Sequence, residues 1–87
     1  MHSVVVHASI SDREAATKAL HDNVVPQVKQ APGFVAGYWN AVGPGKGVSL
    51  VVFESEDQAR AAAEQLRPPG DFVSFDSVEV AEVVAHA

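Results

Sequence analysis

Cysteine is absent from this 87-residue sequence, which excludes disulfide bonds, thiolate zinc sites and cysteine nucleophiles together. Basic residues are scarce: six lysines and arginines stand against eleven acidic residues, and the formal net charge is −5. A nucleic-acid partner is therefore not expected, because it requires a clustered basic face. No apolar run approaches the ~20 residues that span a bilayer, so no membrane partner is expected either.

The N-terminal residues lack the basic segment and cleavage site of a signal peptide, so we expect a cytoplasmic protein. The sequence contains no linker, repeat or low-complexity segment, and its length fits a single domain, residues 1–87. A chain this short buries roughly 60% of its unfolded surface, so its stability is marginal without disulfides, metals or oligomerisation. Without cysteines, oligomerisation is the aid that remains.

What the sequence does contain is a clear alternation of strand and helix patterns. Residues 4–10 form a β-branched run that predicts a strand. One face of this strand is purely apolar, with Val4, Val6, Ala8 and Ile10. The other face is mixed, with Ser3, Val5, His7 and Ser9. We expect helices to cover the first face and a wetter surface to meet the second.

Two helices are predicted by capping boxes that begin at Ser11 and Ser55. The first has an apolar stripe at i+4 spacing, made of Ala16, Leu20, Val24 and Val28. Pro26 removes one backbone hydrogen bond and is expected to kink or end the regular helix. The second helix is short, with a stripe of Ala59, Ala62, Ala63 and Leu66.

Three further strands are predicted at residues 34–42, 48–54 and 72–85. The first two flank the glycine-rich residues 43–47, which predict a hairpin turn. A phosphate loop is not expected there, because no Ser or Thr follows Lys46 and the next element is a strand. The last run changes its alternation near Asp76 and Ser77, which indicates a β-bulge.

The element order βαββαβ predicts an α+β, ferredoxin-like fold, a four-stranded antiparallel sheet with both helices on one face. The opposite face would carry Val5, Val51, Phe53 and one parity of residues 34–42, a patch too apolar to leave in water. A homodimer with two sheets packed face to face, a dimeric α+β barrel, covers it. Residues 72–85 would span about 45 Å if extended, whereas a compact domain of this size is about 30 Å across. This C-terminal strand therefore either bends sharply or, as we expect, runs beyond its own subunit and pairs with the partner.

Two segments carry a family resemblance. Residues 31–38 read Ala-Pro-Gly-Phe-Val-Ala-Gly-Tyr, and residues 51–56 read Val-Val-Phe-Glu-Ser-Glu. With the element order, they make the whole chain resemble the antibiotic-biosynthesis-monooxygenase-like (ABM-like) group of the dimeric α+β barrel superfamily. That group includes cofactor-independent quinone-forming monooxygenases, haem-degrading oxygenases and isomerases. The haem-degrading branch has a tryptophan where this chain has Phe53 and a haem-ligating histidine that residues 59–71 lack, so haem-degrading activity is not expected. The resemblance to the cofactor-independent members then implies that the protein uses no cofactor.

The candidate catalytic residue is His7, which should face the space between the two sheets and could act as general base. The alternative is a hydrogen-bonded interface histidine. Tyr38, Trp39, Asn40 and Phe53 are the candidate substrate-binding residues. Consecutive strand residues alternate, so either Trp39 or the Tyr38–Asn40 pair faces inward, and ordinary packing is the alternative for all. The four histidines have no metal-ligand spacing, so no metal is expected, and no Gly-x-Ser-x-Gly elbow exists.

Two functional hypotheses follow. In the first, the protein is a cofactor-independent monooxygenase that holds a small aromatic or polyketide-type substrate between sheet and helices, with His7 as base. In the second, it is a non-catalytic dimeric module that binds a small hydrophobic ligand or mediates an interaction. The sequence contains no complete catalytic motif that decides between an enzyme and a binding protein.

Overall fold

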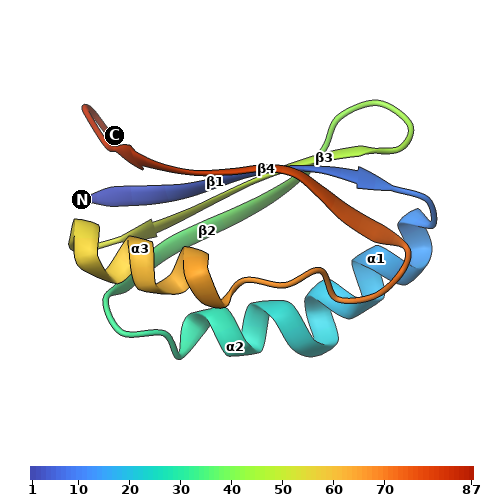
Figure 1. The fold of residues 1–87 in the computed structure, drawn as a ribbon, viewed down its shortest axis with the longest axis horizontal. Coiled ribbons are helices and arrows are strands. Elements are labelled where there is room, and N and C mark those ends of the chain that lie inside the picture. The colour runs from blue at the N-terminus through green and yellow to red at the C-terminus, as the bar shows by residue number, and fades with distance from the viewer.

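In the computed structural model, four antiparallel strands form one sheet, and every helix lies on the same side of it (Figure 1). The strand order is β2-β3-β1-β4, with bounds β1 (His2–Ile10), β2 (Phe34–Ala41), β3 (Lys46–Phe53) and β4 (Val73–Glu82). The first helical segment comprises α1 (Arg13–Ala19), the π-helical turn η1 (Leu20–Val24) and α2 (Val25–Lys29), and the second is α3 (Glu56–Gln65). The predicted α+β class is confirmed, and the topology is consistent with a ferredoxin-like fold.

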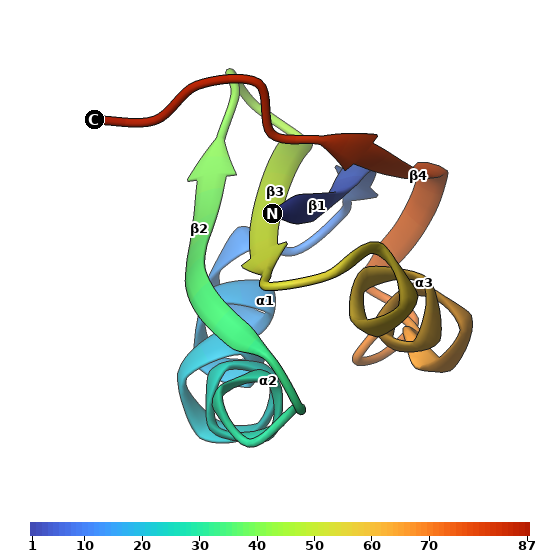
Figure 2. The same cartoon turned by 90° about the vertical axis from the view of Figure 1, so that its left-hand side faces the viewer.

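The apolar face of β1 forms the centre of the core, as its alternation predicts. Val4, Val6 and Ala8 are 3%, 4% and 9% exposed. They face the helices, where Ala59 of α3 packs against Val4 and Val6 in the same cluster. Figure 2 shows α2 beneath the β2 side of the sheet and α3 beneath the β4 side. We call the uncovered side of the sheet, opposite the helices, the open face.

The prediction that Val51 and Phe53 lie on the open face is wrong. Val51 pairs with Val4, and both residues belong to the core between sheet and helices. Phe53 is only 1% exposed, and its ring meets that of Phe34 edge-on at 6.5 Å. The sequence of β3 is apolar on both parities, so only its register against β1 decides which parity faces the helices.

The first helix begins one residue later than predicted. Its N-cap is Asp12, whose Oδ1 accepts a 3.0 Å hydrogen bond from the amide of Ala15. The prediction that the helix is capped by Ser11 is therefore wrong. Serine and aspartate cap helices about equally well, so the residue types alone do not distinguish Ser11 from Asp12. The second capping box is confirmed, because Ser55 accepts from the amide of Gln58 and Gln58 accepts from that of Ser55.

Pro26 interrupts the regular helix without ending it. The five residues before α2 form the π-helical turn η1, and Pro26 lies in the first turn of α2. Proline lacks the N–H that would bond back to the preceding turn, and the altered hydrogen-bonding pattern of a π turn accommodates this loss. The wider π turn therefore lets the segment continue as one rod beneath the sheet.

The hairpin turn and the β-bulge are both confirmed. Gly43 and Gly45 adopt positive φ angles of 59° and 81° between β2 and β3. In β4, Phe75 pairs with Ala8 and Ser77 pairs with His7. Asp76 is the extra residue, which explains the change of alternation in the sequence.

The bulge places Asp76 in a polar cluster with Ser9 and Lys46. The hydroxyl of Ser9 hydrogen-bonds the Asp76 carboxylate oxygens at 3.0 and 2.9 Å, and Lys46 Nζ lies 3.3 Å from the same carboxylate. The Ser9 hydrogen bond and, to a smaller extent, Lys46 lower the pKa of Asp76 below its ordinary value of 3.8. The carboxylate therefore contributes stability above pH 3.8, and this contribution is lost as the pH falls through the lowered pKa.

Replacing Ser9 with alanine is expected to raise the pKa of Asp76 towards its ordinary value, because the main hydrogen bond to the carboxylate is lost. Carbon-detected NMR titration of the Asp76 carboxyl measures this shift directly. Ser11→Ala is the matched control, since Ser11 is exposed and lies two residues away. If Asp76 titrates at the same pH in wild type and Ser9→Ala, the attribution is wrong.

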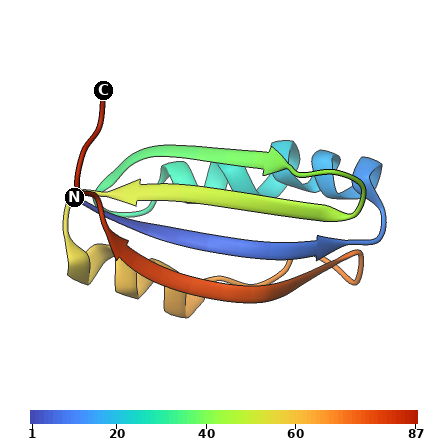
Figure 3. The ribbon, with the colours of Figure 1, turned by 90° about the horizontal axis from the view of Figure 1, so that it is seen from above.

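The C-terminal strand is shorter than its predicted range. β4 ends at Glu82, and one further backbone bond joins the amide of Val83 to the carbonyl of Met1 at 3.0 Å. Residues 83–87 then leave the β4 edge and cross the end of the sheet towards β2 (Figures 2 and 3). Val84 is 88% exposed.

Candidate functional site

Two open cavities lie between the helices and the sheet. The large cavity, about 410 Å³, lies at the end of β1 that leads into α1. The small cavity, about 170 Å³, lies between α2 and α3. Both are lined mainly by apolar side chains, as ligand pockets usually are. They share five lining residues, Val6, Val24, Trp39, Ser49 and Leu66, so they are neighbouring parts of one apolar space.

The large cavity has three walls. The sheet contributes Ala8 and Ile10 of β1, and the helical segment contributes Ala16 and Leu20. The third wall consists of residues after α3, among them Leu66 and Pro69, and of Val73 and Phe75 at the start of β4. Arg13, Thr17, His21 and Arg67 also line this cavity, and all four are exposed, which places them at its mouth.

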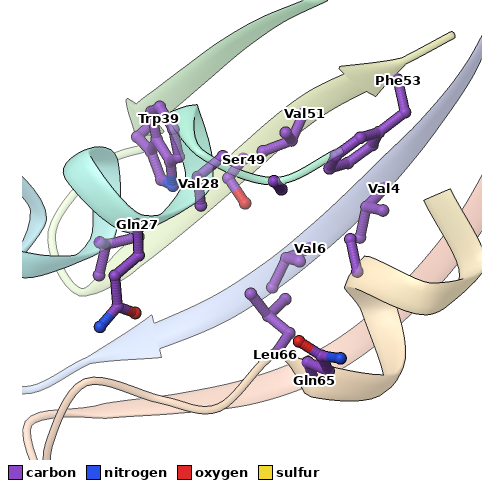
Figure 4. A pocket seen from close by; sticks show the side chains of 13 residues that line it. Val4, Val6, Gln27, Val28, Trp39, Ser49, Val51, Phe53, Gln65 and Leu66 are labelled. Atoms are coloured by element: carbon purple, nitrogen blue, oxygen red, sulfur yellow. The ribbon is translucent and has the colours of Figure 1, made fainter. Parts of the chain in front are cut away.

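The small cavity is shown in Figure 4. Val4, Val6, Val51 and Phe53 line it from the strands. Gln27 of α2 and Gln65 of α3 line it from the two helices, and both are exposed. The small cavity is therefore an apolar groove with an amide-bearing mouth, and it contains no titratable lining residue.

Trp39 is the aromatic side chain common to both cavities. It pairs with Ser49 of β3 on the helix side of the sheet. Its indole ring covers Gly37, where an added Cβ would lie 2.8 Å from Cη2 and 2.9 Å from Cζ3 of the ring. Gly37 does not need positive φ. Because Gly37 has no side chain, the indole has room to pack against the sheet at this position.

Replacing Gly37 with alanine is expected to displace the indole and to lower the stability by about 1–3 kcal/mol, the usual effect of overpacking. Near-ultraviolet circular dichroism reports the ring, since Trp39 is the sole tryptophan. The matched background is Trp39→Phe, whose smaller ring lacks the two crowded atoms. Gly37→Ala should be better tolerated there, and an equal loss in both backgrounds would contradict the steric explanation.

The structure divides the predicted site residues between the two sides of the sheet. Trp39 and Phe53 line the cavities, whereas Tyr38 is 62% exposed and pairs with Leu50 on the open face. Asn40 lines the large cavity at the sheet edge, and its side-chain Nδ2 donates to the carbonyl of Val48 at 3.1 Å. Of the two alternatives for β2, Trp39 is the residue that faces the helices.

His7 and the cavities lie on opposite sides of the sheet. His7 is exposed, pairs with Val48 and Ser77, and alternates with the buried Val6 and Ala8. It points away from the helices, as its strand parity predicts. A substrate held between sheet and helices is therefore out of reach of His7 within one chain.

Sequence reasoning missed the polar mouth of the large cavity. Arg13, Thr17 and His21 follow one another at i+4 spacing, so they form a second stripe beside the apolar stripe of the helix. This spacing is visible in the sequence. Nothing in the sequence, however, indicates that Arg67, from the segment after α3, lines the same cavity.

The remaining basic side chains are mostly paired. Lys18 forms a salt bridge with Asp22, and Arg60 with Glu56, each at i,i+4 spacing. Asp22 raises the pKa of Lys18, and Arg60 lowers the pKa of Glu56, in each case first through the side-chain hydrogen bond. None of these four residues lines a cavity, and both pairs are exposed, so they contribute little stability.

The open face carries a continuous apolar strip. Val5 pairs with Leu50, and Leu50 pairs with Tyr38 on its other side. Val52, beside Leu50 on the same strand face, pairs with Ala36. These side chains are half-buried or exposed in the single chain. The strip thus runs across the three strands β1, β3 and β2.

No group of three or more histidine or acidic side chains is arranged to hold a metal ion. No helix has the length and apolar character needed to cross a membrane. A scan against protein-family models finds no match to this chain, and a search of curated proteins finds none either.

Proposed function

We propose that the chain is a homodimeric small-molecule-binding protein of the ABM-like, dimeric α+β barrel type, with the ligand held in the large cavity. The observation that carries the proposal is the cavity of about 410 Å³, apolar in its interior and polar at its mouth. A cavity of this size and composition suits a bicyclic or tricyclic aromatic molecule. The indole of Trp39 on its wall offers a flat surface for stacking.

The homodimer is supported by the composition of the open face. Only nine of the 87 residues are buried in the single chain. The strip around Leu50 would become a second core if two sheets packed face to face. Residues 83–87, with the almost fully exposed Val84, are in place to reach a partner from the end of β4. We therefore assign the interface to the open face and the C-terminal segment.

Tryptophan fluorescence tests ligand binding, because Trp39 is the only tryptophan. Saturable quenching by naphthoquinone- or anthrone-type compounds is expected. Ala16→Met should fill part of the large cavity, because Ala16 is 5% exposed on its wall, and should weaken binding at least about tenfold. Ala61→Met on the exposed side of α3 is the matched control. Unchanged affinity in Ala16→Met would place the ligand elsewhere.

A second candidate function is cofactor-independent oxygenation, favoured by the resemblance of residues 31–38 and 51–56 to the ABM-like group. In such a reaction an anthrone and O₂ give the quinone and water, and the protein removes a proton from the substrate. His21 is the histidine that lines the large cavity, so it replaces His7 as the proposed base.

Anthrone oxidation followed by quinone absorbance separates the two histidines. We expect His21→Ala to lower the rate at least about 100-fold, the usual contribution of a general base. His7→Ala should leave the rate unchanged, provided that the dimer persists. If wild type does not exceed the uncatalysed rate, the protein binds its ligand without this reaction.

A further inference from the structure

We infer that the large cavity binds an organic anion. The apolar body of this ligand lies against the sheet, and its anionic head group is held at the mouth by Arg13, His21 and Arg67. This inference rests on the proposed function, since it names the chemical class of ligand for the same cavity. A carboxylate, or an enolate with its charge at one end, is the matching head group.

The charges at the cavity are the reverse of those of the whole chain. The sequence has eleven acidic residues and a net charge of −5, yet no acidic residue lines the large cavity. Arg13 and Arg67, two of only three arginines in the chain, both line it. An acidic protein with a basic cavity mouth attracts an anion there, and nowhere else on the walls of the two cavities.

These two arginines also retain free hydrogen-bond donors. Arg13 makes no salt bridge, whereas the third arginine, Arg60, is paired with Glu56. Arg67 donates from Nη1 to the backbone carbonyls of Glu64 and Leu66 at 2.9 and 2.7 Å. Its Nε and Nη2 atoms remain available, so the backbone bonds orient the guanidinium while leaving donors for a carboxylate.

The position of Arg13 is not explained by helix stability. It is the first residue of α1, where the helix dipole favours acidic side chains and disfavours a cation. On the other side of the mouth, Arg67 is followed by Pro68 and Pro69, which restrict the backbone that carries it. The two cations thus come from different walls of one cavity, Arg13 from α1 and Arg67 from the segment after α3.

The apolar interior selects an amphipathic ligand over a small inorganic anion. A small ion would bind only at the exposed rim, whereas burial in the interior would leave it without polar partners. A ligand with an apolar body buries that body and keeps its head group among hydrated donors. The expected ligands are therefore aromatic or aliphatic carboxylates and similar organic anions.

Matched probes test the head group separately from the body. The dissociation constants of 2-naphthoate and 2-naphthamide for the wild-type protein are compared by calorimetry and Trp39 fluorescence. We expect the carboxylate to bind at least about tenfold more tightly than the neutral amide, since charge-assisted hydrogen bonds are about twice as strong as neutral ones. The double variant Arg13→Gln/Arg67→Gln should lose this preference and keep its affinity for the amide within about twofold.

Arg60→Gln is the matched control, because it removes the third arginine, which lines neither cavity, and it should bind both probes as wild type does. Equal affinity of wild type for the two probes would overturn the anion inference and leave cavity binding standing. Failure of both probes to bind would overturn the inference and the proposed function together. A carboxylate preference that survives in the double variant would overturn the assignment to these arginines.

Discussion

Phe53→Ala is expected to destabilise the protein by about 3–5 kcal/mol, the range for removing a buried phenylalanine. Phe53 is 1% exposed and is the largest fully buried side chain. Its ring packs edge-on against Phe34 and lines the small cavity, so truncation would enlarge an existing space rather than let it collapse. A domain of this size has roughly 5–10 kcal/mol of stability, so the loss is a large fraction of the total.

Thermal and urea unfolding followed by circular dichroism measure this effect. A loss of 3 kcal/mol lowers the Tm by about 12–24 °C in a domain of 60–100 residues. Phe53→Leu is the control, since it keeps most of the volume and should lose less than about 1.5 kcal/mol. If Phe53→Ala also loses less than about 1.5 kcal/mol, the Phe53 side chain does not support the core.

Leu50→Glu is expected to convert the proposed dimer into single chains. Leu50 lies at the centre of the open-face strip, between Val5 and Tyr38. A carboxylate there would be buried without a partner between two sheets, and breaking such an interface costs about 3 kcal/mol or more, at least a 100-fold weaker association. In the single chain the same carboxylate would remain hydrated, so its effect on the isolated fold is small.

Sedimentation equilibrium at micromolar concentration tests this prediction. The wild-type protein should have twice the mass of a single chain, and the Leu50→Glu variant should have the mass of a single chain. Ala61→Glu adds the same charge on the exposed side of α3 and should remain dimeric. A wild-type protein that is folded and monomeric at this concentration would contradict the proposed dimer. A dimeric Leu50→Glu variant would show that the interface lies elsewhere than on the open face.

The local features of the fold could be predicted because each has a short-range cause. The period-2 pattern of residues 4–10 correctly separates the helix-facing side of β1 from the open face. The capping box at Ser55 correctly predicts the start of α3, and the change of parity near Asp76 correctly predicts the bulge. At Ser11 the same reasoning misses by one residue, because two adjacent side chains cap equally well.

The orientation of β3 could not be predicted in this way. Val51 and Val52 are both valines, so a shift of one residue exchanges the two faces without changing the pattern. The antiparallel register with β1 places Val51 and Phe53 in the core and leaves Leu50 and Val52 on the open face. The open face therefore stays apolar, but through Leu50 and Val52 rather than Val51 and Phe53.

By itself, the sequence determined the order of the elements, the two-layer α+β class and the side of the sheet that His7 occupies, because hydrophobic periodicity acts over a few neighbouring residues. Only the tertiary structure decided that Trp39 faces the helices and that Arg13, His21 and Arg67 line one cavity. The physical reason is that these residues are brought together by how α1 and the segment after α3 pack on the sheet. Such long-range packing leaves no periodic trace in the chain.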